Sequence, residues 1–95
     1  MGFIVLIILE VKPEKVEDFK SRLLEAAATY RKDPETVDWT VQQDLENANK
    51  FVLIEKYEKE SSLTDIHRKN PIYQETMDFI VTSIVGSIEK HFIHT

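Results

Sequence analysis

The chain contains no cysteine, only two glycines and three prolines, and no long hydrophobic run. Without cysteine it can form no disulfide framework, thiolate metal site or thiol nucleophile, a composition that suits the reducing cytoplasm, where we expect it to reside. So few glycines and prolines exclude a linker-rich or low-complexity sequence. The longest apolar run covers residues 3–9, far short of the roughly 20 residues of a membrane-spanning helix. We therefore expect no membrane association.

Positive charge is also scarce, with 12 Lys and Arg residues against 17 Asp and Glu residues and a net charge of −5. Such a chain repels a phosphate backbone, so we expect no nucleic-acid partner. The 95 residues are 42% hydrophobic and 31% charged, which is the size and balance of one folded domain. We expect residues 1–95 to form that single domain.

Alternation and helical periodicity predict the secondary structure. Residues 3–11 are apolar at nearly every position, which predicts a strand buried on both faces. Residues 14–30 carry apolar side chains three and four positions apart, as an amphipathic helix does. Two alternating segments then predict an antiparallel hairpin. The elements predicted after residue 30 are strands at 37–42 and 51–58, a short helix from 61 or 62 to 68, a helix at 72–84 that Gly86 breaks, and a strand at 87–93.

The order strand, helix, strand, strand, helix, strand is that of the ferredoxin-like split βαβ fold, an α+β class with a four-stranded antiparallel sheet. Helices in this fold cover only one face of the sheet, yet residues 3–11 are apolar on both faces. Leaving the second face in water would forfeit several kcal/mol, which is comparable to the stability of a small domain. We therefore predict a homodimer that forms through sheet-to-sheet packing.

One carboxylate lies on the apolar face of a predicted strand. Glu55 alternates in step with Leu53 and Tyr57, so its side chain is expected among apolar groups, where desolvation raises the pKa of a carboxyl. Such a group can act as a base or an acid. The alternative interpretation is that Glu55 pairs with a cation such as Arg31 at the edge of the sheet.

Histidine is the side chain whose ordinary pKa suits proton transfer near neutral pH, and His67 is the leading candidate for a general base. The alternative is an ordinary surface histidine beside Arg68. His91 and His94 are three residues apart, which places them on opposite faces of a strand. No further ligand joins them at metal-binding spacing, so we predict solvent-facing side chains and no metal.

Aromatic side chains with polar tips occur on several predicted elements. Trp39, Tyr57, Tyr73 and Tyr30 are suited to a cavity that holds a flat apolar molecule. Packing in the core is the alternative role for each of them.

Several short segments resemble the antibiotic biosynthesis monooxygenase family across nearly the whole chain. They are Val11-Lys12-Pro13, Arg31-Lys32-Asp33-Pro34, Gln43-Asp44 and Phe51-Val52-Leu53-Ile54-Glu55-Lys56-Tyr57, followed by His67. The resemblance implies a dimeric α+β barrel with a small active-site cavity between each sheet and its helices. It also implies a monooxygenase that acts on a small aromatic, quinol or enolisable carbonyl compound without a metal, flavin or other cofactor.

The same resemblance implies roles for individual residues. His67 would take the substrate proton, Glu55 would orient or relay it, and Trp39, Tyr57 and Tyr73 would shape an aromatic slot. The chain departs from the family at Glu35, where many relatives have glycine. The alternatives are a small-ligand-binding dimer without turnover, an isomerase of a small phosphorylated signalling sugar, and a structural dimer whose cavity is filled by Trp39 and Met77.

Overall fold

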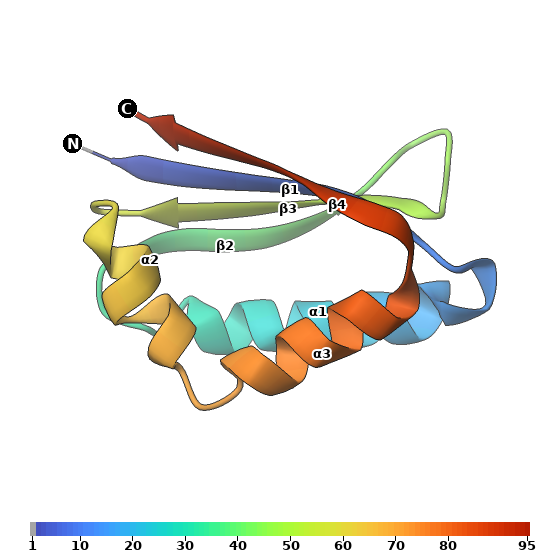
Figure 1. Cartoon of the computed structure of the whole chain (residues 1–95), viewed down its shortest axis with the longest axis horizontal. Helices are drawn as coiled ribbons and strands as arrows, with labels where there is room; N and C mark the ends of the chain where they lie inside the picture. The colour runs from blue at the N-terminus through green and yellow to red at the C-terminus, as the bar shows by residue number, and fades with distance from the viewer. Residues whose placement is uncertain (1) are drawn as a thin grey trace.

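The computed structural model describes residues 2–95, which form a sheet on one side and helices on the other (Figure 1). The strands are β1 (Phe3–Val11), β2 (Thr36–Gln43), β3 (Lys50–Tyr57) and β4 (Ile84–His94); the helices are α1 (Val16–Tyr30), α2 (Ser61–Asp65) and α3 (Tyr73–Ser83), with 3₁₀ turns η1 (Pro13–Lys15) and η2 (His67–Lys69). Among these residues no helix has the length and apolar character needed to span a bilayer.

The sheet has the strand order β2-β3-β1-β4, and every neighbouring pair is antiparallel. β1 therefore lies in the interior of the sheet between β3 and β4, as its apolar sequence requires. The order of elements and the sheet confirm the predicted ferredoxin-like α+β fold. Helices α1 and α3 lie side by side along one face, and α2 closes one end of the molecule (Figure 1).

The boundary between α3 and β4 differs from the prediction. The helix ends at Ser83 and the strand begins at Ile84, three residues earlier than expected. Ile84 and Val85 already pair with β1, because β-branched side chains favour extended backbone. Gly86 does not end the helix; it lies inside β4 with a φ of 74°, where the register against β1 shifts. Its left-handed backbone accommodates that irregularity.

The two faces of β1 have different surroundings. Val5, Ile7 and Leu9 face the helices and are buried, whereas the alternate side chains face outward and remain half-buried. The register extends this outward surface across the sheet: the outward apolar face consists of Ile4, Leu6, Ile8, Val52, Ile54 and Ile93. No helix of the described chain covers it (Figure 1).

The core between sheet and helices has a sharp boundary on α1. Leu23 is 0% exposed and Leu24 is 52% exposed. Replacing Leu23 with Ala removes a fully enclosed side chain and leaves a cavity, which costs about 2–5 kcal/mol of the free energy of unfolding. Leu24→Ala is the matched control and is expected to cost about 0.5 kcal/mol or less. Urea denaturation measures both, and equal losses would contradict this assignment of the core face.

Candidate active site

A buried polar cluster lies between the sheet and the helices. Glu55 and Tyr57 come from β3 and His67 from η2, and they are 3%, 1% and 3% exposed. The Tyr57 hydroxyl donates a hydrogen bond of 2.5 Å to Glu55 Oε1, and His67 Nε2 lies 3.7 Å from the same oxygen. The structure thus brings the two predicted proton-transfer residues together and adds Tyr57 as a direct partner of the carboxylate.

The alternative interpretations of Glu55 and His67 are wrong, whereas Tyr57 also packs in the core. Arg31 Nη1 donates to the backbone oxygen of Trp39 at 2.7 Å, so Arg31 holds β2 and does not pair with Glu55. His67 is not a surface residue, because the 3₁₀ turn after α2 points its ring into the interior, whereas Arg68 and Lys69 remain exposed.

Burial acts on all three ionisable groups of the cluster. It raises the pKa of Glu55, although the hydrogen bond from Tyr57 partly opposes the rise. It also raises the pKa of Tyr57, an effect that the charge of Glu55 reinforces. Burial, with smaller effects from Arg68 and Lys90, lowers the pKa of His67 to about 4. At neutral pH the site therefore holds an uncharged imidazole beside a phenol that stays protonated, and burial makes the carboxyl group of Glu55 a stronger base than an exposed one.

Four aromatic rings surround His67. The centroid distances from its ring are 4.4 Å to Tyr30, 5.2 Å to Tyr73, 5.7 Å to Tyr57 and 6.1 Å to Trp39. Tyr30 and Tyr73 meet the imidazole edge-on. The predicted aromatic residues are thus gathered around the base candidate, which lies in a largely apolar enclosure.

Two nitrogen atoms of the enclosure have no hydrogen-bond partner among residues 2–95: Trp39 Nε1 and His67 Nδ1. The indole N–H lies close enough to Glu55 to lower its pKa, but not in the geometry of a hydrogen bond. A buried polar atom without a partner costs about 1–3 kcal/mol. One fixed donor and one potential acceptor are therefore available to a water molecule or a ligand.

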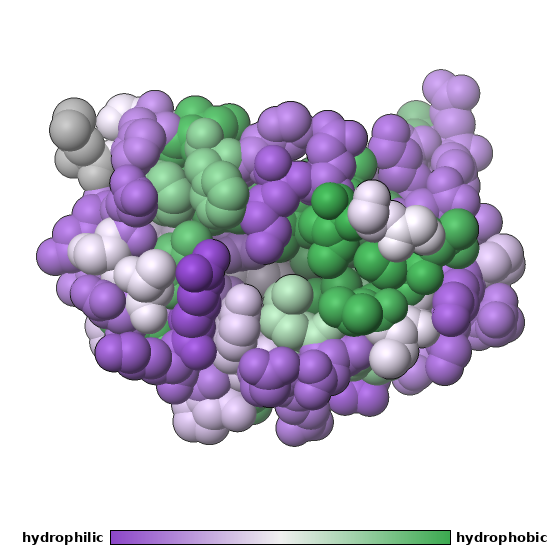
Figure 2. Space-filling model, viewed as in Figure 1, coloured by the Kyte–Doolittle hydropathy of each residue, from purple (hydrophilic) through white to green (hydrophobic). Residues whose placement is uncertain are grey.

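These atoms border a small cavity of about 30 Å³. That volume holds a water molecule or two but no aromatic ring. The lining residues come from both layers and are Val5, Ile7, Tyr30, Trp39, Leu53, Glu55, Leu63, His67, Arg68, Tyr73, Thr76, Met77, Ile80, Lys90 and Phe92. Figure 2 shows a hollow between β4 and α3, with hydrophobic side chains on its right and hydrophilic ones on its left.

Three hydrogen bonds from two side chains tie the segment that carries His67 to the turn between α1 and β2. Asn70 Nδ2 donates to the Asp33 carboxylate at 2.9 Å, and the buried Ser62 hydroxyl donates to Glu35 Oε1 at 2.7 Å. Glu35 has a φ of 65°, a left-handed conformation that favours glycine. Glycine at this position could not bond Ser62, so here a side-chain contact offsets the backbone cost.

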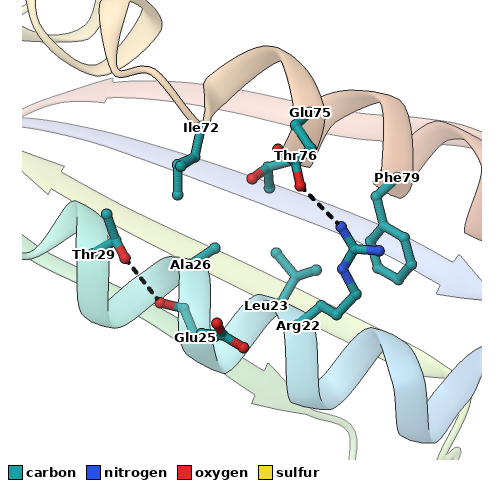
Figure 3. A pocket seen from close by; sticks show the side chains of 9 residues that line it. All are labelled: Arg22, Leu23, Glu25, Ala26, Thr29, Ile72, Glu75, Thr76 and Phe79. Carbon is teal, nitrogen blue, oxygen red and sulfur yellow. Dashed lines mark hydrogen bonds and ion pairs between the residues drawn. The ribbon is translucent and has the colours of Figure 1, made fainter.

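A second cavity, of about 160 Å³, lies between α1 and α3 (Figure 3). Arg22 pairs with Glu75 at 3.6 Å and lies over the Phe79 ring at 4.1 Å. Both charged side chains are largely exposed, and the lining holds no buried titratable group. It is a surface groove whose one cation, Arg22, already has a partner, and we do not regard it as a candidate active site.

The sequence analysis missed the charged residues at the cavity. Arg68 and Lys90 line it from η2 and β4. The sequence could have predicted the position of Lys90. It lies two residues from both Ile88 and Phe92, so on a strand all three side chains face the helices. This is the same kind of pattern that identified Glu55.

The other two histidines lie on opposite faces of β4, as predicted, and both are exposed. His91 Nε2 lies 2.6 Å from Glu89, and His94 Nε2 lies 3.3 Å from Glu60. Over residues 2–95 no group of three or more His, Asp or Glu side chains is arranged to hold a metal ion.

Comparison with known proteins identifies the family. Residues 2–78 match the model of the antibiotic biosynthesis monooxygenase family. The chain belongs to this family. A match over most of the chain also explains why the segments noted in the sequence occur in the family's order. No curated protein sequence gives a match.

Solved structures share the antibiotic biosynthesis monooxygenase fold. A candidate antibiotic biosynthesis monooxygenase from Nitrosomonas europaea is similar with a TM-score of 0.92 and 17% identity, over 99% of this chain and 89% of that chain. A conserved protein from Methanosarcina mazei Go1 gives 0.87 and 24% identity, over 98% and 91%. A variant of SnoaB, a cofactor-independent oxygenase from Streptomyces nogalater, gives 0.85 and 14% identity, over 99% and 92%. Identities this low establish a shared fold.

The lowered pKa of His67 can be measured directly. We expect its ring to remain neutral from pH 7 to 5.5 and to titrate near pH 4, whereas in the urea-unfolded chain it titrates near 6.5. Since the folded-state pKa is the lower one, the stabilising contribution of this residue is complete above pH 6.5 and is lost as the pH falls toward 4. NMR of the imidazole carbons, assigned with His67→Gln, reports the midpoint. A folded-state midpoint at or above 6.5 would contradict the buried, desolvated environment.

Proposed function

We propose that this chain is a cofactor-independent monooxygenase that acts on a small aromatic, quinol or enolisable carbonyl compound. The observation that carries the proposal is a buried, neutral His67 whose Nδ1 is unpartnered while its Nε2 faces Glu55. Membership of the family supports the reaction class, and a fold neighbour, SnoaB, is described as a cofactor-independent oxygenase.

The proposed first step makes the substrate an anion. A substrate hydroxyl gives its proton to His67 Nδ1, and the imidazole passes the proton on its Nε2 to Glu55. Since burial lowers the pKa of His67 and raises that of Glu55, the carboxylate is the better final acceptor. The gap of 3.7 Å between Nε2 and Oε1 must shorten for this transfer, as gaps in empty active sites commonly do. Tyr57 holds the receiving carboxylate in place.

The anion then reacts with oxygen. The free N–H of Trp39 can donate to the developing oxyanion, which stabilises the charge in a dry site. Triplet oxygen reacts slowly with closed-shell molecules, but an electron-rich anion can pass it one electron. For a hydroquinone the balanced outcome is a hydroxyquinone and water, with one oxygen atom on the ring and all four electrons supplied by the substrate. No external reductant is required.

The small cavity favours a second candidate function, a structural dimer whose cavity Trp39 and Met77 fill. Trp39 and Met77 both line a space that admits only water. An aromatic substrate therefore requires the flexible side chains at the mouth, Met77, Arg68 and Lys90, to move aside. Absence of both thermal stabilisation by small aromatic ligands and formation of product would favour this structural role, whereas stabilisation without product would indicate a ligand-binding dimer.

Oxygen uptake with hydroquinones tests the monooxygenase proposal. The wild type should consume oxygen and incorporate one labelled atom from ¹⁸O₂ into the product. His67→Gln and Glu55→Gln should each lower the rate by about 10²–10⁴-fold, the usual contribution of a positioned proton acceptor. His94→Gln is the matched control, since His94 is exposed and does not line the cavity. Equal uptake by the wild type and His67→Gln would reject His67 as the base.

We propose in addition that the protein is a homodimer that buries the outward apolar face. That face combines Ile4, Leu6 and Ile8 of β1 with Val52 and Ile54 of β3, and it lies on the far side of the sheet from the cavity. Removing apolar surface from water contributes about 25 cal/mol per Å². A second copy presents the same self-complementary surface.

The dimer proposal is tested by placing charge at the centre of the outward apolar face. Leu6→Asp should convert a wild-type dimer into a monomer, because an aspartate cannot be buried there without a partner. Ile54→Lys is a second variant in case the first fails to fold, and Leu24→Asp on the exposed side of α1 is the control. Sedimentation velocity at micromolar concentration reports the mass. A folded wild-type monomer under these conditions would overturn the proposal.

A further inference from the structure

Arg68 and Lys90 line the cavity but have no partner of opposite charge. Neither takes part in an ion pair or a side-chain hydrogen bond within the described chain. Both cations are exposed, while the groups proposed to transfer protons lie buried beneath them. They therefore form a positive mouth on a chain whose net charge is −5.

Lys90 lies on the exposed edge strand β4 with apolar neighbours. It pairs across from Ile7 on the helix-facing side of the sheet, with Phe92 next to it in the same phase. A charged residue at such a position disrupts an otherwise apolar row. Arg68 reaches the same cavity from a different element, so two independent parts of the fold deliver positive charge to one opening.

The charges of the lining define the ligand that would complement it. Glu55 is the only carboxylate among the lining residues, and His67 is neutral. Arg68 and Lys90 are the cations of the lining and lie at its exposed rim, whereas Glu55 is buried below them. A ligand with one carboxylate at its outer end complements these two cations, and a phosphate is the competing anion that the test includes. Arginine and lysine both form strong charge-assisted hydrogen bonds to carboxylate oxygens.

We propose that the substrate carries a carboxylate that Arg68 and Lys90 bind at the mouth, so that its phenolic or enolic end points down to His67. The inference rests on the proposed function for the identity of the reacting end. Their charges favour lower pKa values for Glu55 and His67, although burial is the larger effect at both and raises the pKa of Glu55 overall. The substrate is therefore a small aromatic acid bound with its carboxylate outward.

The test compares two ligands of the same size under anaerobic conditions, 2,5-dihydroxybenzoate and its neutral amide, 2,5-dihydroxybenzamide. By isothermal titration calorimetry the acid should bind the wild type about tenfold or more tightly than the amide, as two partly exposed charge contacts allow. The double variant Arg68→Gln, Lys90→Gln should lose this preference. The double variant Lys32→Gln, Lys69→Gln removes the same charge from exposed residues that do not line the cavity and should keep it.

Several results would overturn the inference. The first two are equal affinity of the acid and the amide, and a preference for the acid that survives in the Arg68→Gln, Lys90→Gln double variant. The others are absence of binding of the acid at millimolar concentration, and tighter binding of phenyl phosphate than of the acid. Because binding is measured without oxygen, the two proposals fail separately. Tight binding of the acid with no oxygen uptake would reject the monooxygenase alone, and uptake with neutral hydroquinones but no preference for the acid would reject the carboxylate alone.

Discussion

The structure depends on the burial of one carboxylate in the core. Glu55 is enclosed among apolar and aromatic side chains, where an isolated charge would cost several kcal/mol. The Tyr57 hydroxyl offsets part of this cost with a bond of 2.5 Å, a length typical of a hydrogen bond to an ionised acceptor. Because both residues lie on β3 two positions apart, a single strand brings the donor and the acceptor to the same side of the sheet.

Other parts of the fold position the imidazole against this pair. Asp33 and Glu35, in the turn between α1 and β2, accept hydrogen bonds from Asn70 and Ser62, which flank His67 in sequence. These bonds fix a short 3₁₀ turn that would otherwise have little support of its own. The orientation of the His67 ring is thus set by contacts more than 25 residues away in sequence. Its free nitrogen faces a space that protein atoms leave unfilled.

Much of this arrangement could be predicted from the spacing of apolar residues along the sequence alone. The two-residue alternation of 51–57 placed Glu55 inward, and the order of the predicted elements indicated the ferredoxin-like fold. The burial of His67 could not be predicted, because a 3₁₀ turn of three residues has no periodic signature. The predicted boundary between α3 and β4 was wrong, because glycine is compatible with both the end of a helix and an irregular strand. Only the pairing of Ile84 with Val11 decides between them.

Strand β4 carries consecutive side chains to two different surfaces. Lys90 and Phe92 border the cavity, while His91 and Ile93 face the opposite side of the sheet. Only one neighbouring strand, β1, holds β4, since β4 lies at the edge of the sheet. A ligand that pushes this edge outward must displace both rows together. Binding of a ligand in the cavity would therefore also change the position of the side chains that β4 presents on the outward face of the sheet.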